Sequence, residues 1–300
     1  MTVTVAPKSK HAIAAPAESA RPREQKPRSR RWRFALIAIV LVALAIYWAG
    51  ERRVPAGAAE GATLSGAIVT PRASGSSLRV GSFNIHAGKG IDGQRSIQRT
   101  ADCLRGMDLV ALNEVAGGRP WEDWNQSQQL GEALGCQWLF APTESRLGHG
   151  SFGNGLLTRC KALYWQRIPL DLAGANTHRN VVVTAIEIEG VRVNVLLTHL
   201  DSRDLARRHN QLRAVGELFL SLAEPAILLG DLNSGPEDEQ LQRLLAAPGV
   251  VDAVTAGGAG PATGRIDWIL TRGLRTLESG VVDNGASDHP FVWAELEVAK

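Results

Sequence analysis

The sequence predicts an α+β domain, in which two β-sheets pack face to face with helices outside, preceded by a single transmembrane helix. Three observations lead to this prediction. Short apolar runs recur from residue 78 onward, and segments with helical periodicity lie between some of them. Two of the runs are joined by Glu189-Gly190, which is typical of a tight hairpin turn between antiparallel strands. Upstream of all of them, residues 34–50 contain no charged side chain.

The first 33 residues form a basic arm. They carry nine Lys or Arg against two Glu, and almost no large apolar residue. Such a segment cannot bury enough apolar surface to fold, so residues 1–33 are expected to be a disordered cytoplasmic arm.

Residues 34–50 are expected to be a transmembrane signal-anchor helix. As a helix, this run spans about 25 Å, at the short end of what crosses a bilayer. Trp32 before the run, and Tyr47 with Trp48 at its end, match the aromatic belts of membrane interfaces. A buried soluble helix is disfavoured, because the run is apolar on every face. A cleaved signal peptide is the stronger alternative, although the basic leader is long and no small-x-small site before Glu51 is persuasive.

Charge predicts the orientation of this helix. The nine basic residues before the run outweigh Arg52 and Arg53 after it, so the N-terminus is expected in the cytoplasm. The domain that follows is then expected in the periplasm or outside the cell.

Residues 51–77 are rich in Ala, Gly, Ser and Thr and lack apolar periodicity, which predicts a flexible linker. The charge changes sign after it. Residues 1–77 hold 12 Lys plus Arg and 4 Glu, whereas residues 78–300 hold 21 Lys plus Arg and 26 Asp plus Glu. The domain over 78–300 is therefore acidic, at −5, within a chain of net charge +3, so its charge does not favour nucleic-acid binding.

Within that domain the patterns predict alternating strands and helices. Apolar runs predict strands at 78–84, 109–114, 162–168, 181–188, 191–197, 226–229, 265–270 and 291–296. Helical periodicity predicts helices over 94–105 and 202–223. The three cysteines, Cys103, Cys136 and Cys160, form no CxxC pair or metal-ligand spacing, so we expect small buried apolar roles, with oxidation of two of them an alternative in an exported domain.

Each apolar strand carries a polar or ionisable residue at or near one end. The set comprises Asn84, Glu114, His199, Asp231 and Asp267, together with Asp288 and His289 just ahead of the last strand. In layered proteins such strand ends converge on a crevice that binds ligands. Taken alone, Asp231 and Asn233 could instead simply shape a turn. The whole set suits a divalent cation held by oxygen atoms, with histidines free for phosphate and proton transfer.

Seven segments make the pattern specific: FNIHAGKG, LVALNEV, GNGLLTR, LLTHLD, LLGDLNSGP, RIDWIL and SDHPFVW. In order and approximate spacing, the chain resembles the endonuclease/exonuclease/phosphatase superfamily of deoxyribonuclease I-like metal-dependent phosphoesterases, over about residues 78 to 298. The resemblance implies a four-layer α/β/β/α sandwich of two packed mixed sheets with outer helices.

The resemblance also implies roles for individual residues. Glu114, with Asn84 and Asp288 nearby, corresponds to the metal ligands. Asp231 corresponds to the residue that orients or deprotonates the attacking water, and Asn233 to the amide that holds phosphoryl oxygens or that water. His289 corresponds to the histidine that stabilises the pentavalent phosphate, with Asp267 fixing its tautomer, and His199 contacts a second phosphate oxygen. Asn154, Arg179 and Asn180 fall where relatives touch phosphate, against an alternative of ordinary surface roles.

The predicted function is a membrane-anchored phosphoesterase that uses Mg²⁺, with Mn²⁺ as an alternative, and cleaves a phosphodiester or phosphomonoester by attack of an activated water. We expect a monomer held in the membrane by residues 34–50, acting on a small or lipid-borne substrate. The first alternative is a metal-dependent nuclease acting on nucleic acid. The second is a binding module that keeps the fold without catalysis, which the full set of catalytic residues disfavours.

Overall fold

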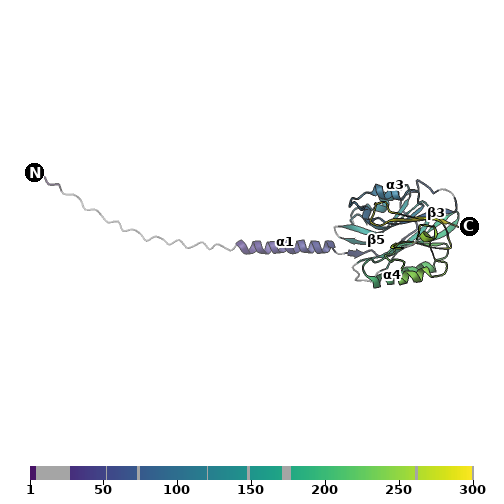
Figure 1. Ribbon diagram of the computed structural model, residues 1–300. Helices are drawn as coiled ribbons and strands as arrows, with labels where there is room; N and C mark the ends of the chain where they lie inside the picture. Colours follow the sequence, from purple (N-terminus) through teal and green to yellow (C-terminus); the bar gives the residue numbers. More distant parts are fainter. Residues whose placement is uncertain are drawn as a thin grey trace. The chain divides into compact units, whose positions relative to one another are not determined.

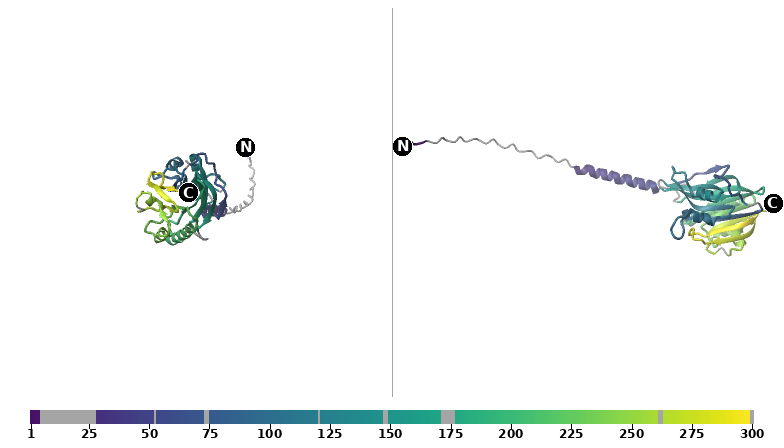
Figure 2. Two further views of the ribbon diagram at one scale, coloured as in Figure 1. Left: turned by 90° about the vertical axis from the view of Figure 1, so that its right-hand side faces the viewer. Right: turned by 90° about the horizontal axis from the view of Figure 1, so that it is seen from above.

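The computed structural model describes residues 1–4, 28–51, 53–72, 75–119, 121–146, 149–170, 177–260 and 263–298 (Figures 1 and 2). Most of the predicted disordered arm, residues 5–27, lies outside the described residues. By its internal contacts the chain forms two compact units, Met1–Ile46 and Tyr47–Lys300.

Helix α1 (Arg28–Glu51) contains the apolar run expected to cross a membrane. Its segment Arg31–Trp48 has a mean hydropathy of 1.7, none of it is buried, and by length and composition it can span a bilayer. Apolar side chains such as Leu36 and Ile39, 63% and 65% exposed, would be poorly solvated in water. The expected apolar helix is present, while its insertion and orientation stay predictions.

The second unit contains two seven-stranded sheets. In sheet A the order is β1 (Arg53–Pro55), β5 (Gln137–Arg146), β6 (Gly150–Thr158), β4 (Leu109–Gly117), β3 (Ser77–Asn84), β14 (Phe291–Glu297) and β13 (Arg275–Val282). In sheet B it is β11 (Val251–Asp252), β12 (Asp267–Arg272), β10 (Ala226–Asp231), β9 (Val191–His199), β8 (Asn180–Ile188), β7 (Lys161–Pro169) and β2 (Ala59–Gly61). Each sheet has one parallel pair, β3 with β4 and β9 with β10, so both sheets are mixed, as predicted.

The sheets form the two middle layers of a sandwich (Figure 1). Between them lies an apolar core, in which Val80, Leu156 and Leu197 are fully buried. Short helices α2 (Ile97–Cys103) and α3 (Gln126–Leu134) cover the outer face of sheet A, and α4 (Leu205–Ser221) and α5 (Glu239–Leu245) cover sheet B. The remaining helical turns are η1 (His86–Gly88) and α6 (Ala253–Ala256). The α/β/β/α architecture predicted from the sequence is confirmed.

Helix α4 shows why these layers hold together. Asp204 caps its first turn by accepting a hydrogen bond from the backbone N–H of Arg207. Leu212, Val215 and Phe219 then recur at helical spacing, and all three are buried against sheet B. At roughly 2 kcal/mol per buried apolar side chain, this face alone fixes the helix on the sheet.

One end of the sandwich collects the strand termini that matter for function. β3, β4, β9 and β10 all end there, and the antiparallel strands β8, β12 and β14 begin there. We call this end the carboxyl edge.

The flexible linker predicted over residues 51–77 needs correction. Two short strands lie within it: β1 pairs with β5, and β2 pairs with β7. Ser65 forms a further bridge with Trp138, and Leu64 is 7% exposed in the core. Edge strands of three residues are held by backbone hydrogen bonds to an adjacent strand, here β5 or β7. They require no apolar periodicity, so the sequence pattern does not predict them.

Candidate active site

The carboxyl edge brings five of the predicted residues together. Asn84 ends β3, His199 ends β9, and Asp231 ends β10. Asp267 begins β12 directly opposite Asp231, and His289 stands two residues before β14. Asp231, Asp267 and His289 offer ligand atoms that lie within 4.8 Å of one another.

Asp231 is the centre of this group and is 1% exposed. Its Oδ2 accepts a hydrogen bond from Asn84 Nδ2 at 3.1 Å and lies 3.4 Å from His199 Nε2 and 3.9 Å from His289 Nε2. Its Oδ1 accepts the backbone N–H of Asn233 at 2.9 Å. The carboxylate is thus fixed from several sides, with one oxygen facing both histidines.

The residue before Asp231 has to be glycine. Gly230 has φ 143°, and a Cβ atom on it would stand 1.9 Å from the carbonyl oxygen of Thr198 on β9. Because only glycine allows this close approach of two parallel strands, it lets His199 and Asp231 end side by side in register.

His289 and Asp267 form a hydrogen-bonded pair. His289 Nδ1 lies 2.7 Å from Asp267 Oδ2, which leaves Nε2 directed at Asp231 and at Asn84 Nδ2, 3.5 Å away. Ser287, not predicted as a site residue, holds this turn: its Oγ donates to the carbonyl of Asn84 at 2.6 Å and accepts the His289 N–H at 3.2 Å. Its only signal in the sequence is its place at the start of the SDH segment.

The two histidines differ in protonation. Burial lowers the pKa of His289, but the hydrogen bond and charge of Asp267, with the charges of Asp231 and Asp288, outweigh it and raise the pKa to about 9. Burial, with the charges of Arg179 and His289, instead lowers the pKa of His199 well below its ordinary value. At neutral pH the site therefore holds a cationic His289 and a neutral His199.

The pKa values of the two central carboxyl groups are both raised. Burial is the main cause for Asp231, followed by the charge of Asp267, and together they bring the Asp231 pKa to about 7. Burial also raises the pKa of Asp267 against the hydrogen bond from His289. A carboxylate with a pKa near neutrality is suited to accept a proton.

Glu114 lies at a distortion of β4. The pairing of β4 with β6 shifts between Leu112 and Val115, and Glu114 has φ 57°, an unusual value for a residue with a side chain. Its half-buried carboxylate makes no hydrogen bond or ion pair with any of the described residues. Asn84 and Asn113 are register partners, so Glu114 follows directly beyond the end of β3.

The donor atoms at this edge fit a divalent cation. Asp267 Oδ1 is buried without a hydrogen-bond partner among the described residues, and the unpaired Glu114 lies one residue beyond Asn113, which is the register partner of Asn84. A buried carboxylate oxygen without a partner, such as Asp267 Oδ1, is costly, and a hard cation with oxygen ligands relieves that cost. Asp288, the third predicted ligand, is more exposed, and its Oδ1 lies 3.1 Å from His86 Nδ1.

An amide network beneath the site joins the two sheets. Asn113 Oδ1 accepts the backbone N–H of Asp231 at 2.9 Å, and its Nδ2 donates to Asn154 Oδ1 at 2.9 Å and to the Thr198 carbonyl at 3.1 Å. Asn154 donates in turn to Asn180 Oδ1 at 2.9 Å. Asn113 was not among the predicted residues, and only its position before Glu114 pointed to it.

This network changes the interpretation of Asn154 and Asn180, which were expected to contact substrate. They are 1% and 2% exposed, and their amides bond to each other and to the backbone of Pro142. They support the floor of the site. Arg179 lies close enough for its charge to lower the pKa of both His199 and Asp201.

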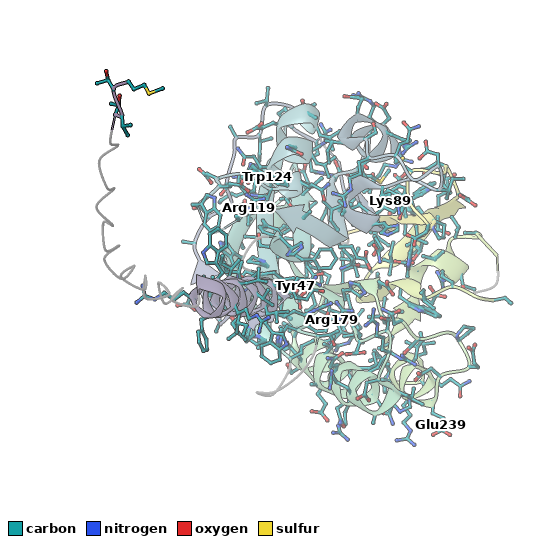
Figure 3. All side chains as sticks on the ribbon, turned by 90° about the vertical axis from the view of Figure 1, so that its left-hand side faces the viewer. Tyr47, Lys89, Arg119, Trp124, Arg179 and Glu239 are labelled. Carbon is teal, nitrogen blue, oxygen red and sulfur yellow. The ribbon has the colours of Figure 1, made fainter. Side chains whose placement is uncertain are left out.

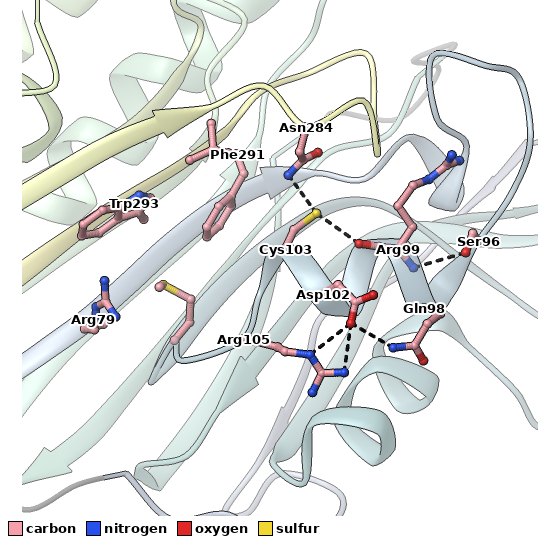
Figure 4. A pocket seen from close by; sticks show the side chains of 12 residues that line it. Arg79, Ser96, Gln98, Arg99, Asp102, Cys103, Arg105, Asn284, Phe291 and Trp293 are labelled. Carbon is pink, nitrogen blue, oxygen red and sulfur yellow. Dashed lines mark hydrogen bonds and ion pairs between the residues drawn. The ribbon is translucent and has the colours of Figure 1, made fainter.

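A separate pocket of about 740 Å³ lies on the outer face of sheet A (Figure 4). Cys103 lies there between Asn284 and the backbone of Arg99, and Arg105 is bonded to Asp102. None of the predicted site residues lines it, so we place the chemistry at the carboxyl edge.

Comparison with known proteins decides the family. The model of the Endonuclease/Exonuclease/phosphatase family matches residues 81–289. The chain belongs to this family. A search of curated proteins gave no match. Members of the endonuclease/exonuclease/phosphatase family are metal-dependent phosphoester hydrolases, so this chain is a phosphoric ester hydrolase that uses divalent metal ions.

Solved structures share the fold. An endonuclease/exonuclease/phosphatase from Beutenbergia cavernae is 24% identical, with 75% of this chain and 72% of that chain covered and a TM-score of 0.60. The mannosyl-6-phosphatase Bt3783 of Bacteroides thetaiotaomicron is 18% identical, with 73% of this chain and 99% of that chain covered and a TM-score of 0.58. D. rerio TDP2 complexed with single strand DNA product is 20% identical, with 74% of this chain and 100% of that chain covered and a TM-score of 0.54.

Proposed function

We propose that this protein is a membrane-anchored, Mg²⁺-dependent phosphoesterase that cleaves a small or lipid-borne phosphoester by attack of an activated water. The observation that carries the proposal is the position of the Asp231 carboxylate, with Oδ2 facing His199 and His289 at 3.4 and 3.9 Å. A proton acceptor and a cationic hydrogen-bond donor thus share one small polar site, as hydrolysis of a phosphate ester requires.

The residues divide the reaction between them. Asp231 takes a proton from water, whose oxygen forms a bond to phosphorus while the ester P–O bond breaks. The leaving oxygen departs with the electron pair of that bond and takes up a proton from solvent water. Cationic His289 donates from Nε2 to a phosphoryl oxygen and stabilises its negative charge, because Asp267 keeps the ring protonated at Nδ1. Neutral His199 contacts a second phosphoryl oxygen.

Glu114 and Asn84, with Asp288, would hold the metal ion. When bound, Mg²⁺ neutralises phosphate charge and makes phosphorus easier to attack. The sharp turn at Glu114 fits this role, since backbone strain of about 1–3 kcal/mol persists mainly where it serves a function.

Helix α1 supports the proposed membrane anchor. Residues 34–50 would cross the bilayer with residues 1–33 in the cytoplasm and the catalytic domain, from residue 78, exported. A reporter that is active only after export, fused after Lys300, should be active and should sediment with membranes. A soluble cytosolic fusion would exclude the anchor, whereas a soluble exported product shortened to begin near residue 50 would indicate cleavage.

Nucleic acid is the alternative substrate, and D. rerio TDP2 bound to single strand DNA product represents it. The net charge of −5 over residues 78–300 disfavours it, because gripping a nucleic-acid backbone requires several cationic contacts. Plasmid nicking at nanomolar enzyme that falls steeply between 50 and 200 mM salt would establish the nuclease instead.

The direct test compares two aspartates. Asp231→Asn should lower Mg²⁺-dependent hydrolysis of bis(4-nitrophenyl) phosphate by two to four orders of magnitude with the fold retained. Asp238→Asn is the matched control: this carboxylate is also partly buried, but it caps α5 and faces His209. Wild-type turnover by the Asp231 variant would exclude the mechanism.

A further inference from the structure

We propose that the carboxyl edge faces the bilayer that holds α1, and that the substrate is a phosphoester in the headgroup of a lipid in that same membrane. This inference rests on the membrane anchor of the proposed function. It goes further by naming the end of the domain that would meet the membrane and the source of the substrate.

The domain begins at one end of sheet A. Only Arg52 separates the end of α1 at Glu51 from the start of β1 at Arg53. Arg53 is the register partner of Arg146, the last residue of β5. β5 and β4 are both antiparallel to β6, so β5 ends at the same edge as β4. Arg53, the first residue of β1, therefore lies at the carboxyl edge.

The entry point is fixed to the sheet. Arg53 Nη1 lies 2.9 Å from Glu144 Oε1, the Ala56 N–H donates to the Thr143 carbonyl, and β2 continues the attachment on sheet B. At about 4.8 Å per strand, the three steps from β1 to β4 place the entry about 15 Å from the strand that carries Glu114.

Large apolar residues are exposed on the segments that leave the carboxyl edge. Ile91 in the loop after β3 is 74% exposed, Trp121 after β4 is 65% exposed, and Leu205 after β9 is 53% exposed. All three lie within seven residues of the end of a strand that carries a site residue: Asn84, Glu114 and His199, respectively. Exposed apolar side chains thus lie on three of the segments that leave the carboxyl edge, and such side chains gain from leaving water.

The loop after β4 has the composition of a membrane-interface segment. The Gly118 N–H donates to the Trp124 carbonyl, which closes a protruding loop, and the Arg119 guanidinium lies 5.9 Å from the centre of the Trp121 ring. Figure 3 shows Arg119 and Trp124, with Lys89 and Arg179 from other loops, on one view of the domain. In the described part of residues 53–298, Trp121 and Trp124 are the aromatic residues that are largely exposed. Trp beside a basic side chain is typical of the headgroup region.

The test uses the full chain in phosphatidylcholine–phosphatidylglycerol vesicles containing one-tenth brominated phosphatidylcholine. The fluorescence of the wild type minus that of the Trp121→Ala/Trp124→Ala variant gives the emission of these two residues. Brominated lipid should quench this emission at least twofold. Trp165→Phe is the control, because Trp165 lies within β7, away from this edge. The emission of Trp165, obtained by the same subtraction, should not be quenched by brominated lipid.

The catalytic arm separates the two proposals. Ile91→Ser/Trp121→Ala/Leu205→Ser should lower hydrolysis of phospholipid in these vesicles at least tenfold and leave hydrolysis of soluble bis(4-nitrophenyl) phosphate within twofold. Val69→Ser/Leu220→Ser is the matched control, since these exposed residues lie by the Gly135 turn and the C-terminal end of α4, and it should change neither rate.

The outcomes are distinct. If the wild type hydrolyses the soluble ester but bromine does not quench Trp121 and Trp124, the proposed orientation of the domain is wrong and the phosphoesterase function stands. The same conclusion follows if the two sets of variants lower phospholipid hydrolysis in vesicles equally. If the wild type hydrolyses neither the soluble ester nor phospholipid, the proposed function is wrong. Bromine quenching of Trp121 and Trp124 then tests the orientation of the domain by itself.

Discussion

Asn113 allows the sharpest test of how the site is built. It is fully buried and makes three hydrogen bonds: one accepted from the Asp231 N–H and two donated, to Asn154 Oδ1 and to the Thr198 carbonyl. Asn113→Ala leaves all three partners buried without their bonds. At about 1–3 kcal/mol for each unsatisfied group, with some relief from water entering the space, the expected loss in free energy of unfolding is about 3–5 kcal/mol.

The same substitution should also lower turnover. The Asp231 backbone loses the bond that holds it to sheet A, so its carboxylate shifts relative to His289. A displacement of about 1 Å costs on the order of a hundredfold in rate, so kcat should fall by ten- to a hundredfold with little change in KM. Stability is measured by urea unfolding of the full chain in detergent, and turnover with bis(4-nitrophenyl) phosphate under conditions where the variant is folded.

Asn194→Ala is the matched control. Asn194 is also buried, at 4% exposed, and bonds to the Ala223 carbonyl and to Arg192 Nε, but it pairs with Ala226 at the far end of β10. It should lose about 1–3 kcal/mol of stability and keep its turnover. Equal turnover of the two folded variants, or an Asn113 variant as stable as wild type, would refute the reasoning.

Three further predictions follow from the site. Asp267→Asn removes the anion that raises the pKa of His289 to about 9, so the alkaline limb of the pH–kcat profile, near pH 9 in the wild type, should move to lower pH; an unmoved limb would show that His289 does not act as the cation. Gly230→Ala should destabilise the fold by more than 3 kcal/mol in urea unfolding, because its Cβ would meet the Thr198 carbonyl at 1.9 Å, whereas Gly190→Ala, with φ 83° and no atom within 4 Å, should lose about 1 kcal/mol. Millimolar Mg²⁺ should raise the Tm of the wild type and raise the Tm of the Glu114→Gln variant much less. An equal rise in Tm in both proteins would show that Glu114 does not bind the metal.

The sequence by itself determined the strands, their polar ends and the family. Runs such as Ala226–Leu229 and Val181–Ile188 are apolar at nearly every position because both faces of their sheet are covered, and this signal is local. The hairpin turn at Glu189-Gly190 could also be predicted, because Gly190 has a φ of 83°, which favours glycine in a tight turn. Asp231 and His289 were found for the same reason, since polar residues stand out at the ends of apolar runs.

The tertiary structure alone decided which polar groups meet and in what state. Asn113 looks like an ordinary strand residue, and its three partners lie 41, 85 and 118 positions away in the chain. Nothing local separates His199 from His289, yet burial lowers the pKa of one while buried carboxylates raise that of the other. Residues 53–61 show no periodicity and still form two strands, because their partners are the exposed backbone edges of β5 and β7. Apolar periodicity is written along the chain, whereas hydrogen-bond partners, electrostatic neighbours and edge pairing depend on segments that become neighbours only on folding.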